Sequence, residues 1–221
     1  IVFCNLHRLF IVNGPRMRDT TGMATTFPPE RVVTLRDGTP VRVRPIRPDD
    51  APRLMEFHSR LSMNTTRLRF FTPMKRLAAP FAEHLCTVDF AKRCAFVISP
   101  VDADTIHAVG RYEAESRRSA ELAFVVEDEF QGRGIGPILL EALVDHARVR
   151  GFDRLTGVAL CENANMLALF RESPYLPEIT VENDCAFVKL NIAAGRDAAR
   201  PASKRPTRGL APAPRLRAAG E

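Results

Sequence analysis

The sequence has no tryptophan, only two tyrosines, and no close pair among its five cysteines, which are Cys4, Cys86, Cys94, Cys161 and Cys185. An odd cysteine count without Cys-x-x-Cys spacing predicts neither a disulfide framework nor a zinc site. No apolar run approaches the ~18–20 residues that a membrane-spanning helix needs. Residues 1–12 are apolar but lack a basic segment ahead of them, so we expect no signal peptide. These absences favour a cytoplasmic protein that binds no metal and no membrane.

The net charge of +6 is concentrated at one end of the chain. Residues 195–221 hold seven Lys and Arg against Asp197 and Glu221, and they are rich in Ala and Pro. Such a segment cannot bury enough apolar surface to offset its ordering entropy, so we expect a disordered basic tail. We interpret it as a solubilising tail, or alternatively as a tether to acidic partners, and do not expect nucleic acid as the principal partner.

The start of the chain contains few signals of regular structure. Residues 1–30 include Gly14-Pro15 and Pro28-Pro29, which predict a flexible lead-in. Met17 or Met23 is a candidate for the natural first residue.

Residues 31–194 alternate strand and helix patterns and predict one mixed α/β domain. Asp37-Gly38 between two β-branched runs predicts a hairpin of residues 32–35 and 41–46. A helix follows, with Asp49 or Asp50 available as its N-cap. The further expected helices follow Thr65-Thr66 and span 80–86, 138–150 and 165–171, and the further strands are 95–99, 105–114, 121–126, 154–161, 179–182 and 186–192.

The sharpest motif is the glycine-rich loop Gln131-Gly132-Arg133-Gly134-Ile135-Gly136, between a strand and a helix. Glycines let backbone N–H groups turn toward a ligand, and the helix adds the positive end of its dipole, so the loop suits a pyrophosphate. A dinucleotide-binding motif is excluded because its third glycine would fall on Leu139, and no Gly-Lys-Ser/Thr of a P-loop follows. The Gln-x-x-Gly-x-Gly spacing is typical of an acetyl-CoA site, and the alternative is a plain glycine turn.

This loop resembles motif A of the Gcn5-related N-acetyltransferase (GNAT) family, and residues 155–160 and 162–167 resemble that family's fifth strand and the helix after it. Residues 35–50 and 69–75 are similar to the acetyltransferase domain of Pat-type protein-lysine acetyltransferases, including the cyclic-AMP-regulated mycobacterial type but without its nucleotide-binding domain. The resemblance implies a GNAT fold for residues 31–194, with a mixed central sheet of about six to seven strands. That sheet should splay between strands 4 and 5 and carry helices on both faces. It also implies acetyl-CoA as cosubstrate and, as acceptor, a lysine of a protein such as an acyl-CoA synthetase.

The same resemblance assigns the cofactor contacts. Backbone groups of Ala123, Phe124 and Val125 would hold the pantetheine arm, and Asn163, at the end of the fifth strand, would bond the pantetheine side. Arg171 could reach a CoA phosphate. The pyrophosphate would lie on the loop of Gln131, Gly132, Arg133, Gly134, Ile135 and Gly136.

A general base is expected because the attacking amine must be neutral, whereas a free lysine has a pKa of ~10.4. The Pat resemblance places this base at Glu121, which strand alternation puts on the same face as Ala123 and Val125. Glu113 and Glu162 are reserve candidates.

Two departures from the family pattern concern the end of the reaction and the acceptor groove. The tyrosine that protonates the leaving thiolate in many members corresponds to Phe170 here, so this acid is absent or replaced by Tyr175. The family's Gly-Phe after that helix is replaced by Ser173-Pro174-Tyr175. Two alternatives therefore stay open: an acetyltransferase for a small amine or amino acid, and a CoA-binding regulator with little turnover.

Overall fold

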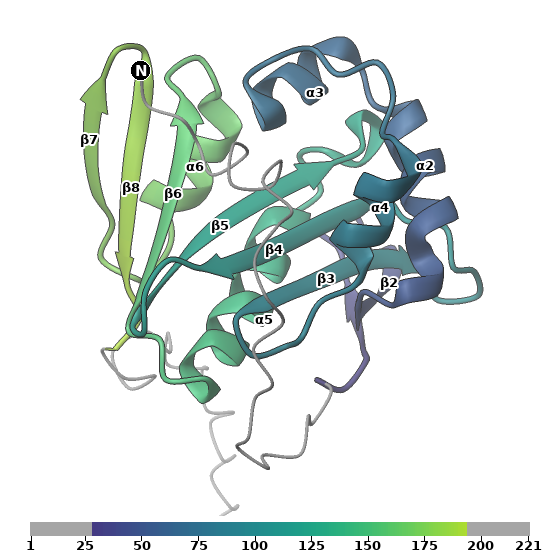
Figure 1. Ribbon diagram of the computed structural model, residues 1–221, viewed down its shortest axis with the longest axis horizontal. Coiled ribbons are helices and arrows are strands. Elements are labelled where there is room, and N and C mark those ends of the chain that lie inside the picture. Colours follow the sequence, from purple (N-terminus) through teal and green to yellow (C-terminus); the bar gives the residue numbers. More distant parts are fainter. Residues whose placement is uncertain (1–27, 194–221) are drawn as a thin grey trace, which may run out of the picture.

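The computed structural model describes residues 28–193, and the expectations for residues 1–27 and 194–221 lie outside this range. A mixed sheet of eight strands, in the order β1-β2-β3-β4-β5-β6-β8-β7, has helices on both faces (Figure 1). The family resemblance implied six to seven strands, whereas all eight strand segments expected from the sequence pattern are present, with β1 and β7 at the two edges. The strands are β1 (Arg31–Thr34), β2 (Pro40–Pro45), β3 (Arg93–Pro100), β4 (Ala108–Ala114), β5 (Ser119–Val126), β6 (Arg154–Leu160), β7 (Glu178–Glu182) and β8 (Cys185–Asn191). The helices are η1 (Pro48–Asp50), α2 (Ala51–Arg60), α3 (Met63–Phe70), α4 (Ala79–Cys86), η2 (Asp128–Phe130), α5 (Ile135–Val149) and α6 (Ala164–Arg171).

The Asp-Gly hairpin is confirmed. β1 and β2 pair in antiparallel register, and Gly38 takes a φ of 87° in the turn between them. Glycine adopts this left-handed conformation without a steric penalty. The Leu35 N–H donates to the Thr39 carbonyl at 2.9 Å and the Thr39 N–H donates to Asp37 Oδ1 at 3.0 Å, so the turn has a defined shape.

The two larger apolar cores lie on opposite faces of the sheet. On one face α2 and α4 pack on each other and bury Leu54, Phe57 and Leu85. On the other face α5 contacts β3, β4 and β5 and buries Leu139 and Leu143. Each such side chain contributes about 1.5–3 kcal/mol by leaving water.

α5 approaches the sheet closely because β4 carries a glycine at the crossing point. A Cβ added at Gly110 would lie 3.1 Å from the Leu139 Cβ and 3.1 Å from Phe124 Cδ1, closer than ordinary contacts. Glycine thus fixes the distance between α5 and the centre of the sheet.

Two boundary predictions and one cap prediction need correction. β4 begins at Ala108 rather than at residue 105. α5 begins at Ile135 rather than at 138, because Pro137 is tolerated in the first turn, where its missing N–H is not needed. Asp50 precedes α2 but makes no side-chain cap; its carboxylate instead accepts bonds from Arg44 at 2.6 and 2.8 Å.

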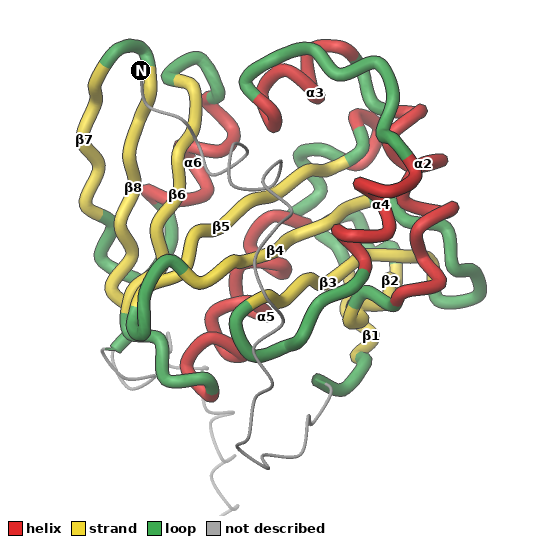
Figure 2. Tube along the Cα trace, viewed as in Figure 1, coloured by secondary structure: helices red, strands yellow, loops and turns green. Residues whose placement is uncertain are grey.

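The resemblance predicts a splay between strands 4 and 5 of the family fold. In this chain the corresponding strands are β5 and β6. These strands are parallel and pair only at Ser119–Arg154, Ala120–Leu155 and Glu121–Thr156. Beyond Glu121, β5 pairs with β4 alone and β6 pairs with β8 alone. Figure 2 shows β5 and β6 diverging.

Candidate functional site

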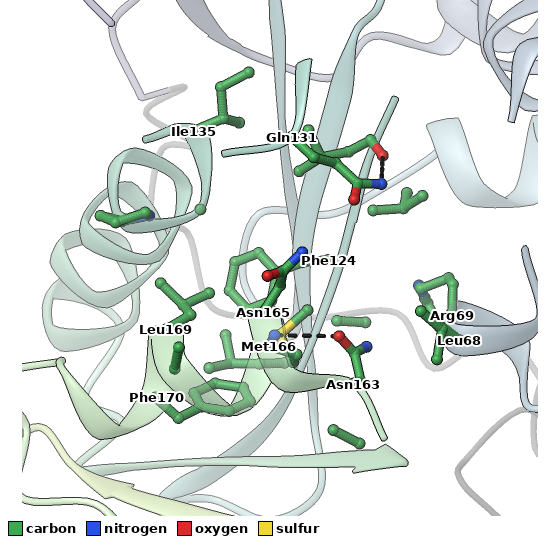
Figure 3. Close-up of a pocket in the computed structure, with 18 of the residues that line it drawn as sticks. Leu68, Arg69, Phe124, Gln131, Ile135, Asn163, Asn165, Met166, Leu169 and Phe170 are labelled. Carbon is green, nitrogen blue, oxygen red and sulfur yellow. Dashed lines mark hydrogen bonds between the residues drawn. The ribbon is translucent and has the colours of Figure 1, made fainter. Parts of the chain in front are cut away.

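A cavity of about 340 Å³ opens where β5 and β6 diverge. One wall is β5 from Glu121 to Val126, and the opposite wall is formed by α6 and the residues just before it. Leu68 and Arg69 of α3 line a third side, and the glycine loop ahead of α5 closes the end (Figure 3). The cavity therefore occupies the gap left by the splay, and the segments that line it are far apart in the sequence.

The glycine loop presents backbone donors to the cavity. Gly132 and Gly134 take φ values of 75° and 89°, a conformation that other residues adopt only with strain. Among the described residues, none accepts a hydrogen bond from the N–H groups of Gly132, Arg133 or Gly134. The first N–H groups of α5 add to this set, since a helix leaves them without internal partners. The loop therefore has the donors and the positive helix end that an anionic group requires.

Gln131 has a structural contact that its motif did not reveal. Its Nε2 donates to Thr65 Oγ1 at 3.2 Å and to the Val126 carbonyl at 3.1 Å, which ties the loop to α3. Asp128 strengthens the same connection, because it accepts from the Ser62 N–H at 3.0 Å and from Thr65 Oγ1 at 2.8 Å. Burial tends to raise the pKa of Asp128, but these hydrogen bonds outweigh it and hold the pKa below its ordinary value.

A connected set of side chains packs beside the start of the loop. The Glu127 carboxylate is buried and accepts from Arg60 Nε at 2.7 Å, and it lies 2.7 Å from His107 Nδ1. The His107 ring stacks on Phe130 with ring centroids 3.9 Å apart. The Arg133 guanidinium also contacts Phe130, 4.8 Å from the centre of its ring. Phe130 lines the cavity, so this set links a buried ion pair to the cavity wall.

Glu121 lines the cavity at the last residue pair that β5 makes with β6. Along β5 the buried residues Ala120, Leu122 and Phe124 alternate with Glu121 and Ala123, which are half-buried, so Glu121 lies on the expected face. The reserve candidates lie elsewhere. Glu113 and Glu162 do not line the cavity, and Glu162 pairs with Arg67 at 2.5 Å, which lowers the pKa of its carboxyl.

The remaining cofactor predictions divide into two groups. Ala123, Phe124, Val125, Gln131, Gly132, Gly134, Ile135, Gly136 and Asn163 line the cavity. Asn163 is also the N-cap of α6, with its Oδ1 accepting from the Met166 N–H at 3.1 Å. Arg133 and Arg171 do not line it: Arg133 lies 3.4 Å from Asp37 Oδ2, and Arg171 is exposed at the end of α6.

Neither tyrosine of the chain lies at the cavity. The Tyr112 hydroxyl lies 2.7 Å from His146 Nδ1 in the core below α5, and the Tyr175 ring packs under Arg148 at 5.4 Å. Phe170 does line the cavity; it is 2% exposed and meets Phe124 at a ring-centroid distance of 6.4 Å. The position expected for a tyrosine acid is thus part of an apolar wall.

Sequence reasoning missed the part of the lining that comes from outside the motif. Thr65, Leu68, Arg69 and Phe71 line the cavity from α3 and its end, and Arg36 lines it from the β1–β2 turn. The helical pattern predicts α3 but not its position beside β5. No spacing in the chain relates Arg36 to the loop that it contacts.

Among residues 28–193 no three His, Cys, Asp or Glu side chains gather as a metal site would require. In the same part of the chain, no helix has the length and apolar character to cross a membrane.

Comparison with known proteins gives a consistent assignment. Residues 41–173 match the model of the GNAT acetyltransferase domain family. The chain is 32% identical over 138 residues to acetyltransferase PA5475 of Pseudomonas aeruginosa, covering 61% of this chain and 74% of that protein. It is 32% identical over 136 residues to acetyltransferase Pat of Mycolicibacterium smegmatis, covering 61% of this chain but only 40% of that longer protein.

A solved structure agrees with these sequence matches. The GNAT domain of S. lividans PAT superposes with a TM-score of 0.67 at 32% identity, covering 73% of this chain and 96% of that one. The family match, the splayed sheet and the glycine loop lead to the same assignment: this chain belongs to the GNAT family and is an acetyl-CoA-dependent N-acetyltransferase.

Proposed function

We propose that the chain transfers the acetyl group of acetyl-CoA to the ε-amine of a lysine on a protein, with Glu121 as the general base. The observation that supports this most directly is the position of Glu121, which lines the cavity where β5 and β6 part. The similarity to Pat acetyltransferases supports a protein acceptor, and an acyl-CoA synthetase is a suitable first candidate.

The cavity fits the chemical groups of CoA. The cradle at Gly132–Gly136 would take the pyrophosphate. The β6-facing edge of Ala123, Phe124 and Val125 would pair with the amides of the pantetheine arm, because β6 has left that edge. The Asn163 Oδ1 is occupied by its cap, so we assign the contact with the arm to its Nδ2. We leave Arg171 and the side chain of Arg133 out of the proposed set because neither residue lines the cavity, and we keep only the backbone N–H of Arg133 in the cradle.

When bound, acetyl-CoA supplies an activated thioester whose acetyl carbon accepts the amine. Glu121 would receive the proton of the lysine ammonium, directly or through a water, because a carboxylate beside the acceptor can hold that proton while the amine attacks. The apolar wall of Phe124, Met166 and Phe170 would keep bulk water from the thioester. No tyrosine hydroxyl is available to protonate the departing thiolate, so we assign no residue to that step.

The first test is acetyl-CoA consumption by the purified chain with a purified acyl-CoA synthetase and, separately, a panel of small amines. Acetylated lysines on the synthetase, with the small amines inert, would support the proposal. Turnover with small amines alone would replace the acceptor but keep the enzyme class, and CoA binding without turnover would favour a regulator.

The second test addresses the base. Glu121→Gln should lower kcat by about 10²–10⁴-fold, the usual contribution of a general base, while the affinity for CoA stays unchanged. Glu113→Gln is the matched control, since Glu113 lies directly opposite Glu121 on β4 but outside the cavity and exposed. An active Glu121→Gln enzyme would rule out this assignment.

A further inference from the structure

We propose that Arg36, in the turn between β1 and β2, binds a phosphate group of CoA and completes the phosphate site of the glycine loop. The inference rests on the proposed position of the cofactor in the cavity. It assigns a ligand-binding role to a residue that lies about a hundred positions away from the motif.

The turn that carries Arg36 is attached directly to the glycine loop. The Arg36 N–H donates to the Arg133 carbonyl at 3.1 Å, and the Asp37 carboxylate lies 3.4 Å from Arg133 Nη1. Hydrogen bonds from Thr39, together with the charge of Arg133, lower the pKa of Asp37, so this carboxylate stays ionised near neutral pH. The hairpin and the loop are therefore positioned relative to each other before any ligand arrives.

The Arg36 side chain lies against the backbone of the loop. A Cβ added at Gly134 would be 3.0 Å from the Arg36 Cγ and 3.3 Å from its Nε, so the missing side chain at this position makes room for the arginine. Arg36 lines the cavity next to Gly132 and Gly134, whose N–H groups have no acceptor among the described residues. A guanidinium and a set of backbone donors thus border the same end of the cavity.

The charge of Arg36 is available to a ligand. Asp37 pairs with Arg133, but within residues 28–193 no carboxylate pairs with the Arg36 guanidinium, and its side chain is exposed. The other cationic residue that lines the cavity, Arg69, comes from α3, across the cavity from α5 (Figure 3). Backbone N–H groups give hydrogen bonds without a full charge, so Arg36 supplies the positive charge that a phosphate at this end needs.

CoA offers two phosphate sources here, the pyrophosphate and the 3′-phosphate of the ribose. A guanidinium can bind either with two parallel hydrogen bonds. CoA and 3′-dephospho-CoA differ only in the second source, so comparing them separates the two.

The experiment measures the binding of CoA and 3′-dephospho-CoA by calorimetry to the full chain, to Arg36→Gln and to Arg36→Lys. Arg36→Gln should weaken CoA binding by about 5- to 20-fold, a modest effect because the side chain is exposed. Arg36→Lys should recover part of this loss, since it keeps the charge without the planar fork. Arg117→Gln, which removes an exposed arginine from the distant β4–β5 turn, is the matched control and should bind like the wild type.

A loss in Arg36→Gln that is equal for both ligands assigns Arg36 to the pyrophosphate, and a loss confined to CoA assigns it to the 3′-phosphate. Unchanged affinity for both ligands, in a variant with wild-type thermal unfolding, would overturn the inference. The proposed acceptor and base are tested separately, because the wild type can bind CoA through Arg36 and still fail to acetylate a protein.

Discussion

Replacing Asp50 by asparagine should destabilise the protein strongly while leaving the shape of residue 50 almost unchanged. Asp50 and Arg44 are 1% and 0% exposed and form two hydrogen bonds, at 2.6 and 2.8 Å. Asp50 also accepts from the Arg47 N–H at 2.8 Å. In the asparagine variant, the amide nitrogen would face the donors of Arg44, and the buried guanidinium would lose its hydrogen-bonded counter-charge, keeping only Asp104 Oδ1 at 3.8 Å from its Nε.

Breaking a buried ion pair on one side costs about 3–5 kcal/mol, because the remaining charge stays buried without compensation. For a chain of this size each kcal/mol shifts the midpoint of thermal unfolding by about 2–4 °C, so we expect a decrease of roughly 6–20 °C. The assay is urea and thermal unfolding followed by circular dichroism. Asp49→Asn is the control, since Asp49 is 73% exposed and lies 3.9 Å from Arg53; it should change stability by less than about 1 kcal/mol.

Equal stability of the Asp50→Asn and Asp49→Asn variants would refute this reasoning. The double variant Arg44→Met/Asp50→Asn provides a further check. It removes both charges, and it should be more stable than Asp50→Asn alone.

Two further predictions concern the support of the glycine loop and the thiols. Burial tends to raise the pKa of Glu127, but hydrogen bonds from Arg60 and His107 lower it below 4.5, so this pairing stabilises the fold above pH 4.5 and is lost as the pH falls further. Glu127→Gln should therefore be less stable than the wild type by about 1–3 kcal/mol at pH 7, and the difference should shrink in thermal unfolding below pH 4.5; a constant difference would contradict this account. Cys86 and Cys94 are buried, and burial raises the pKa of Cys86 to about 11 and that of Cys94 further. Both should resist iodoacetamide in the native protein, whereas the partly exposed Cys161 and Cys185 should react; mass spectrometry of the labelled peptides distinguishes the four positions.

The elements that the sequence predicted well are those determined by local chemistry. Asp37-Gly38 specifies a hairpin because glycine accepts the required backbone conformation, and the pair folds as expected. The glycines of the loop at Gly132–Gly136 predict its position between a strand and a helix for the same reason. The splay beside the loop is predicted by the resemblance to the family. The roles of Glu121 and of the cofactor contacts stay predictions, since their positions in the cavity agree with such roles without testing them.

The features that escaped prediction depend on contacts between elements. Asp50 lies at a helix-cap position, but its carboxylate pairs with Arg44, six residues earlier on β2, and both side chains are buried, which the cap pattern does not indicate. Arg36 reaches Gly134 only because the β1–β2 turn lies on the loop before α5. Hydrophobic periodicity does not encode either contact, because it describes which face of an element is buried and not which element covers it.

The splay between β5 and β6 also has a consequence for assembly. Unpaired strand edges normally attract strands of other chains and lead to aggregation, which is why proteins shield them. Here the unpaired side of β5 lies in the interior of an eight-stranded sheet, with β6, α6 and α3 around it and Gln131 bonded to the last carbonyl. A second protein strand would need room in the cavity for its side chains, whereas the pantetheine arm has amides without a row of side chains and needs far less space. The fold thus keeps an unpaired sheet edge inside a cavity and restricts by size what can pair with it.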